Sequence, residues 1–238
     1  MLALPLLFET EPLSFAPGDP GAETMARATE DISSPSDLRA YQPGDPMKKI
    51  HWKLSARKGE LLLRKYDEPI LQDALVLMDC SAPPTWGRPE AAADVRDTLV
   101  ETAASLMAQA QGGEHPITLP LQGAHPMELK GSMPLDVICE HLARLDFSAD
   151  ERFEQVLLWE TRRLRSVGSV VILSARLNGA MVELMCRMRQ LGPMVRLYLV
   201  TFSPEDPRLA PMIARLQQAE VEVAYVRPGV WREKEARA

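Results

Sequence analysis

The sequence contains few aromatic residues, few cysteines and no long apolar segment. Phe, Trp and Tyr make up 5% of its 238 residues, and the three cysteines, Cys80, Cys139 and Cys186, form no CxxC pair. An odd number of widely spaced cysteines argues against a disulfide scaffold and is typical of buried thiols in a reducing compartment. No stretch approaches the ~18 consecutive apolar residues of a transmembrane helix. We therefore expect no membrane-spanning segment in the sequence as given.

Motifs of common nucleotide-binding and hydrolytic sites are also missing. The sequence has no GxxxxGK[ST], no GxGxxG after its first predicted buried strand, no HExxH and no GxSxG. These absences argue against a P-loop, a dinucleotide site, a zinc protease and a nucleophile elbow. The four histidines, at positions 51, 115, 125 and 141, are scattered. We expect a protein that is not an enzyme, with no catalytic residue and no small-molecule substrate; a hydrolase that uses Asp79 is the weaker alternative.

What is present is typical of a soluble globular protein. Apolar residues make up 46% and charged residues 25% of the chain, so a core can be buried. The net charge of −6 argues against a surface built to bind nucleic acid. Proline is frequent, with 20 residues, seven of them within residues 1–47. Because proline interrupts helices, we predict that residues 1–72 form a small, mostly β appendage.

From residue 73 onward, apolar runs alternate with helical periodicities. Buried strands are predicted at residues 74–78, 169–173, 194–200 and 221–226, a hairpin at 117–129, and helices beginning near 89, 135, 153, 178 and 207. This alternation predicts an α/β domain over residues 73–228, a Rossmann-like, mostly parallel sheet with helices on both faces. Residues 229–238 are predicted to be a charged tail. Ligands of such sheets bind beyond the carboxyl ends of the strands, which directs attention to the residues after Met78, Leu173 and Val200.

The segment from Lys48 to Lys65 is strongly basic. It holds seven Lys or Arg and one acid, Glu60, so its local charge is +6. Because the net charge of the whole chain is −6, the remaining residues carry a net charge of −12. Such asymmetry is typical of a patch that meets an anionic partner, although a solvated rim paired with acids of the same protein is the alternative. Alternating side chains predict a hairpin over residues 50–66 with its turn at 57–60 and Trp52 packed in the core.

A resemblance to a known family enters at these residues. The stretch Arg39-x-Tyr41-x-Pro43-Gly44-Asp45, followed by Ile50-His51-Trp52-Lys53-x-Ser55-Ala56-Arg57, resembles the signature of the bacterial "domain of unknown function 58" proteins. Lys48 and Lys49 stand where the family usually has arginine, which keeps the charge but loses a bidentate grip on a carboxylate. The run from Leu75 to Ser81 is similar to the first strand and loop of the von Willebrand factor A-like domain that such proteins contain.

The resemblance also implies a Mg²⁺ site, which A-like domains build at the carboxyl ends of their strands from D-x-S-x-S, a threonine and a second aspartate. Asp79 and Ser81 match the first two positions, and Pro83 replaces the second serine. Ser174 is retained after the predicted strand at 169–173, but Ala175 stands where the second aspartate belongs, beside Arg176. Mg²⁺ requires oxygen ligands, so we expect a degenerate metal-ion-dependent adhesion site with weak or no Mg²⁺ binding and no other cofactor. Asp79 is instead expected to bond the loop amides of residues 81–82 or to pair with Arg176.

The function implied by the resemblance is that of an adaptor. Family members are commonly encoded beside MoxR-type AAA+ ATPases, and A-like domains act as docking platforms, so we expect a cytoplasmic protein-interaction module that works with such an ATPase in a chaperone-like, envelope or stress assembly. The basic segment and the loop 79–88 would make the contacts. Candidate interaction residues are Arg39, Asp45, Lys48, Lys49, His51, Lys53, Arg57 and Arg176.

The alternative is the soluble part of a membrane-anchored protein. Many relatives begin with two transmembrane helices before a proline-rich β segment, which the residues from Met1 to Leu7 resemble. In that case the basic segment would lie near anionic headgroups at the cytoplasmic face of the inner membrane, and the A-like domain would bind a divalent metal and a ligand. In neither case do we expect nucleic acid as a partner, because aromatic residues are not interleaved with the basic ones.

Overall fold

The computed structural model describes residues 4–8, 10, 38–42, 47, 50–64, 73–85, 89–111, 115–122, 126–148 and 152–229. The chain divides into two compact units, a larger one of residues 1–16 and 71–238 and a smaller one of residues 17–70. Residues 1–16 thus group with the larger unit, whereas the sequence placed them in the appendage. Apart from residue 229, the predicted charged tail lies outside the described residues.

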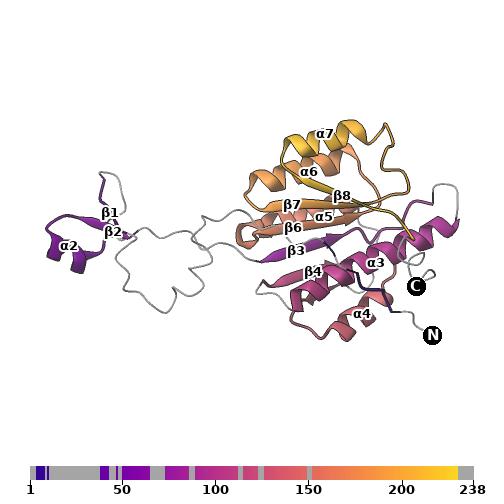
Figure 1. Ribbon diagram of the computed structural model, residues 1–238, viewed down its shortest axis with the longest axis horizontal. Helices are drawn as coiled ribbons and strands as arrows, with labels where there is room; N and C mark the ends of the chain where they lie inside the picture. The colour runs from indigo at the N-terminus through magenta and orange to yellow at the C-terminus, as the bar shows by residue number, and fades with distance from the viewer. Residues whose placement is uncertain are drawn as a thin grey trace. The chain divides into compact units, whose positions relative to one another are not determined.

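Six strands of the larger unit form one sheet in the order β5-β4-β3-β6-β7-β8 (Figure 1). Neighbouring strands are parallel throughout, except that β5 runs antiparallel to β4. The predicted α/β class with a mostly parallel sheet is therefore confirmed, and the predicted hairpin at 117–129 is the β4–β5 pair. The strands are β3 (Ala74–Met78), β4 (Ile117–Leu121), β5 (Met127–Lys130), β6 (Ser169–Ser174), β7 (Met194–Val200) and β8 (Glu222–Val226).

Helices cover both faces of this sheet (Figure 1). Side chains of α3 (Pro89–Gln111) and α4 (Leu135–Ala143) pack in the core of one face. The core of the other face contains side chains of α5 (Phe153–Glu160), of the 3₁₀ helix η3 (Thr161–Ser166), and of α6 (Gly179–Gln190) and α7 (Ala210–Gln218). Among the described residues, no helix combines the length and apolar character needed to cross a bilayer.

The central strand β3 explains why a continuous apolar run folds in this way. All five of its residues are buried. Because successive side chains of a strand point to opposite faces, Val76 and Met78 join the core beneath α3 and α4, whereas Leu75 and Leu77 join the core beneath α5 to α7. A strand that is covered on both faces needs apolar residues at every position, and β3 has them.

Residues near the N-terminus bind α3. The amide of Phe8 donates to Ser105 Oγ at 3.1 Å, and Gln109 Nε2 donates to the carbonyl of Thr10 at 2.7 Å. Ser105 is buried. The first described segment is thus held on the larger unit by hydrogen bonds to one helix.

The described residues of the smaller unit include a two-stranded antiparallel sheet and a short helix. β1 (Leu38–Ala40) pairs with β2 (Leu62–Arg64), and α2 (Trp52–Lys58) lies between them in the sequence. The predicted hairpin over residues 50–66 is therefore wrong, because residues 52–58 are helical. His51 Nδ1 accepts the amide of Leu54 at 3.3 Å as a cap, and Gly59, with φ of 73°, ends the helix in the left-handed conformation that favours glycine.

The environment of Trp52 also differs from the prediction. Ile50 is 6% exposed, but Trp52 is 58% exposed, so this tryptophan is not a core anchor. The chain enters a helix at residue 52, and side chains 50 and 52 no longer share one face as they would in a strand. Ser55 is the buried residue of α2, and its hydroxyl accepts the amide of Leu62 at 2.9 Å.

Candidate functional site

The candidate site lies where β3 and β6 end. These two strands are parallel neighbours, with Met78 opposite Leu173, so the residues that follow them emerge at the same edge of the sheet. The chain passes from β3 to β4 on one side and later returns to β6 on the other, which is the reversal of strand order where ligands of α/β sheets bind. The amide of Asp79 donates to the carbonyl of Leu173 at 2.9 Å and joins the two loops where they begin.

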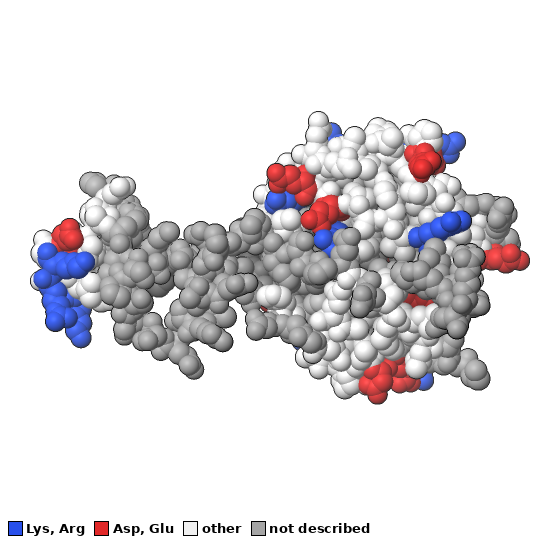
Figure 2. All heavy atoms as spheres, in the orientation of Figure 1, with Lys and Arg blue, Asp and Glu red and all other residues white. Residues whose placement is uncertain are grey.

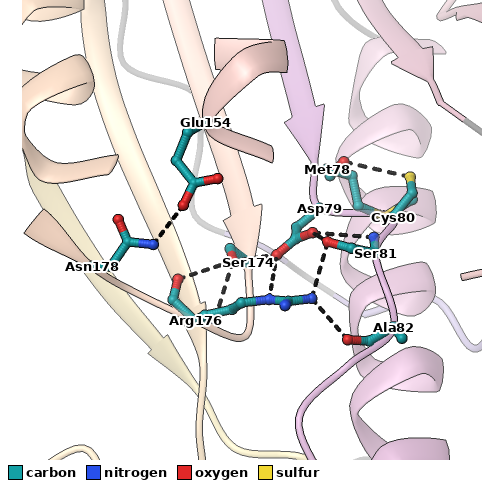
Figure 3. Close-up of polar contacts among 9 residues, drawn as sticks. All are labelled: Met78, Asp79, Cys80, Ser81, Ala82, Glu154, Ser174, Arg176 and Asn178. Atoms are coloured by element: carbon teal, nitrogen blue, oxygen red, sulfur yellow. Dashed lines mark hydrogen bonds and ion pairs between the residues drawn. The ribbon is translucent and has the colours of Figure 1, made fainter. Parts of the chain in front are cut away.

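The carboxylate of Asp79 is enclosed by hydrogen bonds, and its side chain is 3% exposed. Oδ1 accepts the amide of Ser81 at 3.1 Å and also the hydroxyl of Ser81. Oδ2 accepts the hydroxyl of Ser174 at 3.0 Å. Figure 3 shows these side chains converging from the ends of the two strands. Buried charges in proteins are paired and hydrogen-bonded, and this carboxylate fulfils both conditions.

Arg176 supplies the charge partner. Its Nε lies 3.1 Å from Oδ2 of Asp79, and its Nη2 donates to Ser81 Oγ at 3.0 Å and to the carbonyl of Ala82 at 2.8 Å (Figure 3). The Arg176 amide is fixed by a 3.1 Å hydrogen bond to Ser174 Oγ. The guanidinium therefore bridges the loops after β3 and β6, and the contacts of Asp79 with the Ser81 amide and with Arg176 are those that the sequence predicted.

This arrangement bears directly on the magnesium site of A-like domains. Both oxygens of Asp79 accept hydrogen bonds, and a guanidinium stands beside them, where it would repel a divalent cation. Ala175 and Pro83 supply no side-chain oxygen. Within the described ranges, no three His, Cys, Asp or Glu side chains come close enough together to hold a metal. The donor groups at this edge do not fit the octahedral oxygen shell that Mg²⁺ requires.

A second pair of residues holds the Arg176 loop to the helix layer, and the sequence analysis missed it. Asn178 caps α6, with its Oδ1 accepting the amide of Met181 at 3.0 Å, while its Nδ2 donates to Glu154 Oε1 of α5 at 2.7 Å (Figure 3). That hydrogen bond is the main cause that lowers the pKa of the Glu154 carboxyl below its ordinary value. Asparagine just before an amphipathic helix is a cap signal that the sequence does carry.

Cys80 is adjacent to Asp79 but has no nucleophilic character. Its side chain is buried, and its thiol donates to the carbonyl of Met78 at 3.4 Å. Burial raises the pKa of the Cys80 thiol to about 12. Because the thiolate is the reactive form, this cysteine is a small apolar residue at neutral pH.

The structure describes some of the candidate interaction residues of the smaller unit. Lys53 and Arg57 are exposed on α2, where Figure 2 shows basic side chains gathered, whereas the His51 ring is the cap of that helix. Arg39 belongs to β1, where its backbone pairs with Leu63. Asp45, Lys48 and Lys49 lie outside the described residues. Arg176, which the sequence grouped with these candidates, is engaged by Asp79, Ser81 and Ala82.

Two of three comparisons with known proteins found matches. Residues 37–145 match the family described as "Protein of unknown function DUF58". Among solved structures, the chain is similar to one titled "Crystal Structure of the SpRpn10 VWA domain", with 14% identity and a TM-score of 0.40 over 68% of this chain and 90% of that chain. No curated protein shows significant similarity to it.

The family match runs from the smaller unit through β3 to α4, so it includes Asp79 and Ser81 but ends before Ser174 and Arg176. It covers less than half of the chain, and it includes the signature at residues 39–57 on which the resemblance was based. Residues 37–145 thus match the family that the sequence resembles.

Proposed function

We propose that this protein is a non-catalytic protein-interaction module whose sheet edge is closed by an internal arginine. The observation that carries the proposal is the enclosure of Asp79. A carboxylate that acts as a base, nucleophile or metal ligand needs an accessible oxygen, but this side chain is 3% exposed and both of its oxygens accept hydrogen bonds. The acid that follows β3 is therefore structural.

Arg176 takes the place that a metal ion has in related A-like domains. Guanidinium is charged at every physiological pH, so the loops at residues 79–82 and 174–178 stay connected without a dissociable ligand. Its three donated contacts to Asp79, Ser81 and Ala82 fix the shape of this edge. A fixed surface suits a docking platform, which is the role that the family resemblance implies.

The contact surface that we propose is on α2. Four residues at contiguous positions around the helix, Trp52, Lys53, Ala56 and Arg57, are all exposed, and Trp52 is 58% exposed; we call these four residues the α2 surface. Tryptophan and arginine are enriched among residues that dominate protein interfaces. Two cations beside an exposed indole favour an acidic protein partner. The resemblance names that partner as a MoxR-type AAA+ ATPase.

The test is capture of a MoxR-type ATPase encoded beside this protein by the immobilised full chain. Reversal of two charges on the α2 surface, Lys53→Glu with Arg57→Glu, is expected to weaken capture at least 10-fold. The matched control reverses two exposed cations of the larger unit, Lys130→Glu with Arg187→Glu, and is expected to bind like the wild type. Wild-type protein that fails to bind the ATPase would refute this partner. Equal binding by both pairs would exclude the α2 surface from the interface.

A further inference from the structure

A second feature of the same sheet edge lies away from Asp79. A cavity of about 520 Å³ lies at the carboxyl ends of β7 and β8, beside the first turns of α3. Its volume is within the range of ligand pockets, roughly 300–1,000 Å³. The amide of Thr201 donates to the carbonyl of Val226 at 3.0 Å and holds the two strand ends together. The cavity is lined by Glu90, Ala91, Asp94, Thr201, Phe202, Ser203, Asp206 and Arg227.

The described residues of the lining include three acids and one cation. The acids are Glu90, Asp94 and Asp206, and the cation is Arg227. No ion pair joins Arg227 to these acids within the part of the chain that the structure describes. One oxygen of Asp206 accepts the amide of Arg208 at 2.9 Å, which leaves its second oxygen available. Carboxylates such as those of Glu90 and Asp206 attract a cation and disfavour a phosphate or another anion.

The hydroxyl of Thr201 is a hydrogen-bond donor on the lining of this cavity. Its side chain is buried, at 8% exposure, and its Oγ accepts the amide of Ser203 at 3.1 Å. Among the described residues, no acceptor takes the proton of this hydroxyl. Because Thr201 borders the cavity, its hydroxyl proton can be donated to an oxygen acceptor on a ligand. Arg227, on the same lining, has further N–H donors for an oxygen acceptor.

The aromatic member of the lining is Phe202, whose side chain is 38% exposed. An ammonium or guanidinium group over the face of a phenyl ring is attracted by the ring. The ring also covers the apolar methylene groups of a long basic side chain. Carboxylates, the phenyl ring of Phe202 and hydrogen-bond donors therefore line one cavity.

From these contacts we infer that the cavity receives an arginine or lysine side chain from an extended segment of a protein partner. The basic group would contact the acids and the ring of Phe202, and a backbone carbonyl of the same segment would accept from Thr201 and Arg227. A peptide supplies both a cation and carbonyl oxygens within one residue. The inference rests on the proposed interaction function, and it assigns to the larger unit a binding site for a basic peptide, separate from the α2 surface.

The test uses the full chain and two probes, observed by NMR and calorimetry. The first probe is the capped peptide acetyl-Gly-Gly-Arg-Gly-Gly-amide, with glutamine in place of arginine as its control. The second is agmatine, which has a guanidinium group and an amine but no carbonyl. We expect the arginine peptide to bind with a dissociation constant near or below about 1 mM, the range of a single anchor, and to shift the signals of residues 201–206.

Variants connect the binding to the cavity. Glu90→Gln with Asp206→Asn is expected to weaken binding of the arginine peptide at least fivefold. The control pair, Asp136→Asn with Glu140→Gln, replaces exposed acids of α4 and is expected to leave peptide binding unchanged. Thr201→Val is expected to weaken binding of the peptide but not binding of agmatine. Absence of binding at 5 mM peptide, equal binding of the glutamine peptide, or insensitivity to the Glu90 and Asp206 pair would overturn the site. Peptide binding that Thr201→Val leaves unchanged would overturn the assignment of a peptide segment.

These outcomes are separable from those of the ATPase experiment. Failure of the peptide with intact ATPase capture refutes the cavity site and leaves the proposed function standing. Conversely, peptide binding that is retained in the Lys53→Glu, Arg57→Glu protein supports the cavity as a site of its own, whereas loss of peptide binding in that variant would contradict it.

Discussion

The guanidinium of Arg176 lies 3.1 Å from Oδ2 of Asp79, although the two residues are 97 positions apart in the chain. The pair joins the loops that follow two neighbouring strands at the middle of the sheet. A buried carboxylate and a half-exposed cation, with side chains 3% and 41% exposed, thus stand at the meeting point of these two loops.

Replacement of Arg176 by alanine is expected to destabilise the protein. Asp79 would keep its hydrogen bonds from Ser81 and Ser174 but lose its charge partner, and removal of one member of a buried pair is costly. Because Arg176 is partly exposed, the loss is discounted for solvent screening, to about 1–2 kcal/mol of the free energy of unfolding. Urea denaturation at pH 7 measures it. Arg187→Ala, at an exposed position of α6, is the control and should change stability by less than about 0.5 kcal/mol. Equal stability of the two variants would contradict a structural role for the pair.

Divalent metal binding is expected to be weak in the native protein and to appear after two substitutions. We predict a dissociation constant for Mg²⁺ or Mn²⁺ weaker than about 100 µM, because the oxygen shell is incomplete and a guanidinium adjoins it. Ala175→Asp with Arg176→Ser restores the second carboxylate and removes the cation, so the affinity should increase at least 10-fold. Titration calorimetry compares the two proteins, with Arg176→Ser alone as the control. Tight binding by the wild type would show that the present donor set suffices.

Acid stability should depend on Glu154. Its pKa is lowered mainly by the hydrogen bond from Asn178, so the carboxylate contributes stability that is fully present above the ordinary pKa of about 4.3 and is lost as pH falls through the lower folded value. Glu154→Gln should therefore flatten the decrease of stability below about pH 5, measured as the urea midpoint between pH 3 and 7. Asp136→Asn, an exposed acid of α4, is the matched control. A pH profile identical to the wild type would mean that the Asn178 contact does not favour the ionised form.

Cys80 should resist alkylation in the folded protein. With a pKa of about 12 and a buried side chain, the thiol has on the order of one thiolate in 10,000 molecules at pH 8. Iodoacetamide labelling followed by peptide mass mapping should show modification of Cys80 in urea but almost none in native buffer over the same interval. Labelling at a similar rate in both conditions would contradict the burial of this residue.

The sheet and its helices were predictable because each strand carries its own signal. Val76 and Leu77 belong to an unbroken apolar run, and such a run predicts a strand that is covered on both faces. The hairpin prediction around Trp52 failed because seven residues are too few to establish a period. An alternation of apolar and basic residues is compatible with a strand and with a short helix equally. The decisive signals were local, namely the His51 cap and the left-handed Gly59.

The candidate site was predictable only for residues that adjoin strong strands. Asp79 directly follows β3 and Ser174 is the last residue of β6, and the sequence showed both positions and the missing second acid. The sequence also indicated that the residues after Val200 lie at this edge of the sheet. It did not predict that they share a cavity with Glu90 and Arg227, because α3 has to pack against the sheet to bring these residues together. Similarly, the bond between Asn178 and Glu154 joins two helices, and no spacing in the sequence predicts it.

The order of the two units along the chain has a mechanical consequence. The smaller unit is inserted between residues 16 and 71 of the larger one, so it is tethered at both ends. One tether follows the segment bonded to α3 through Ser105 and Gln109, and the other leads into β3, a central strand that ends at Asp79. A partner that pulls on α2 would therefore load α3 and the middle of the sheet together, and a single cut of the chain in either tether would leave the smaller unit attached.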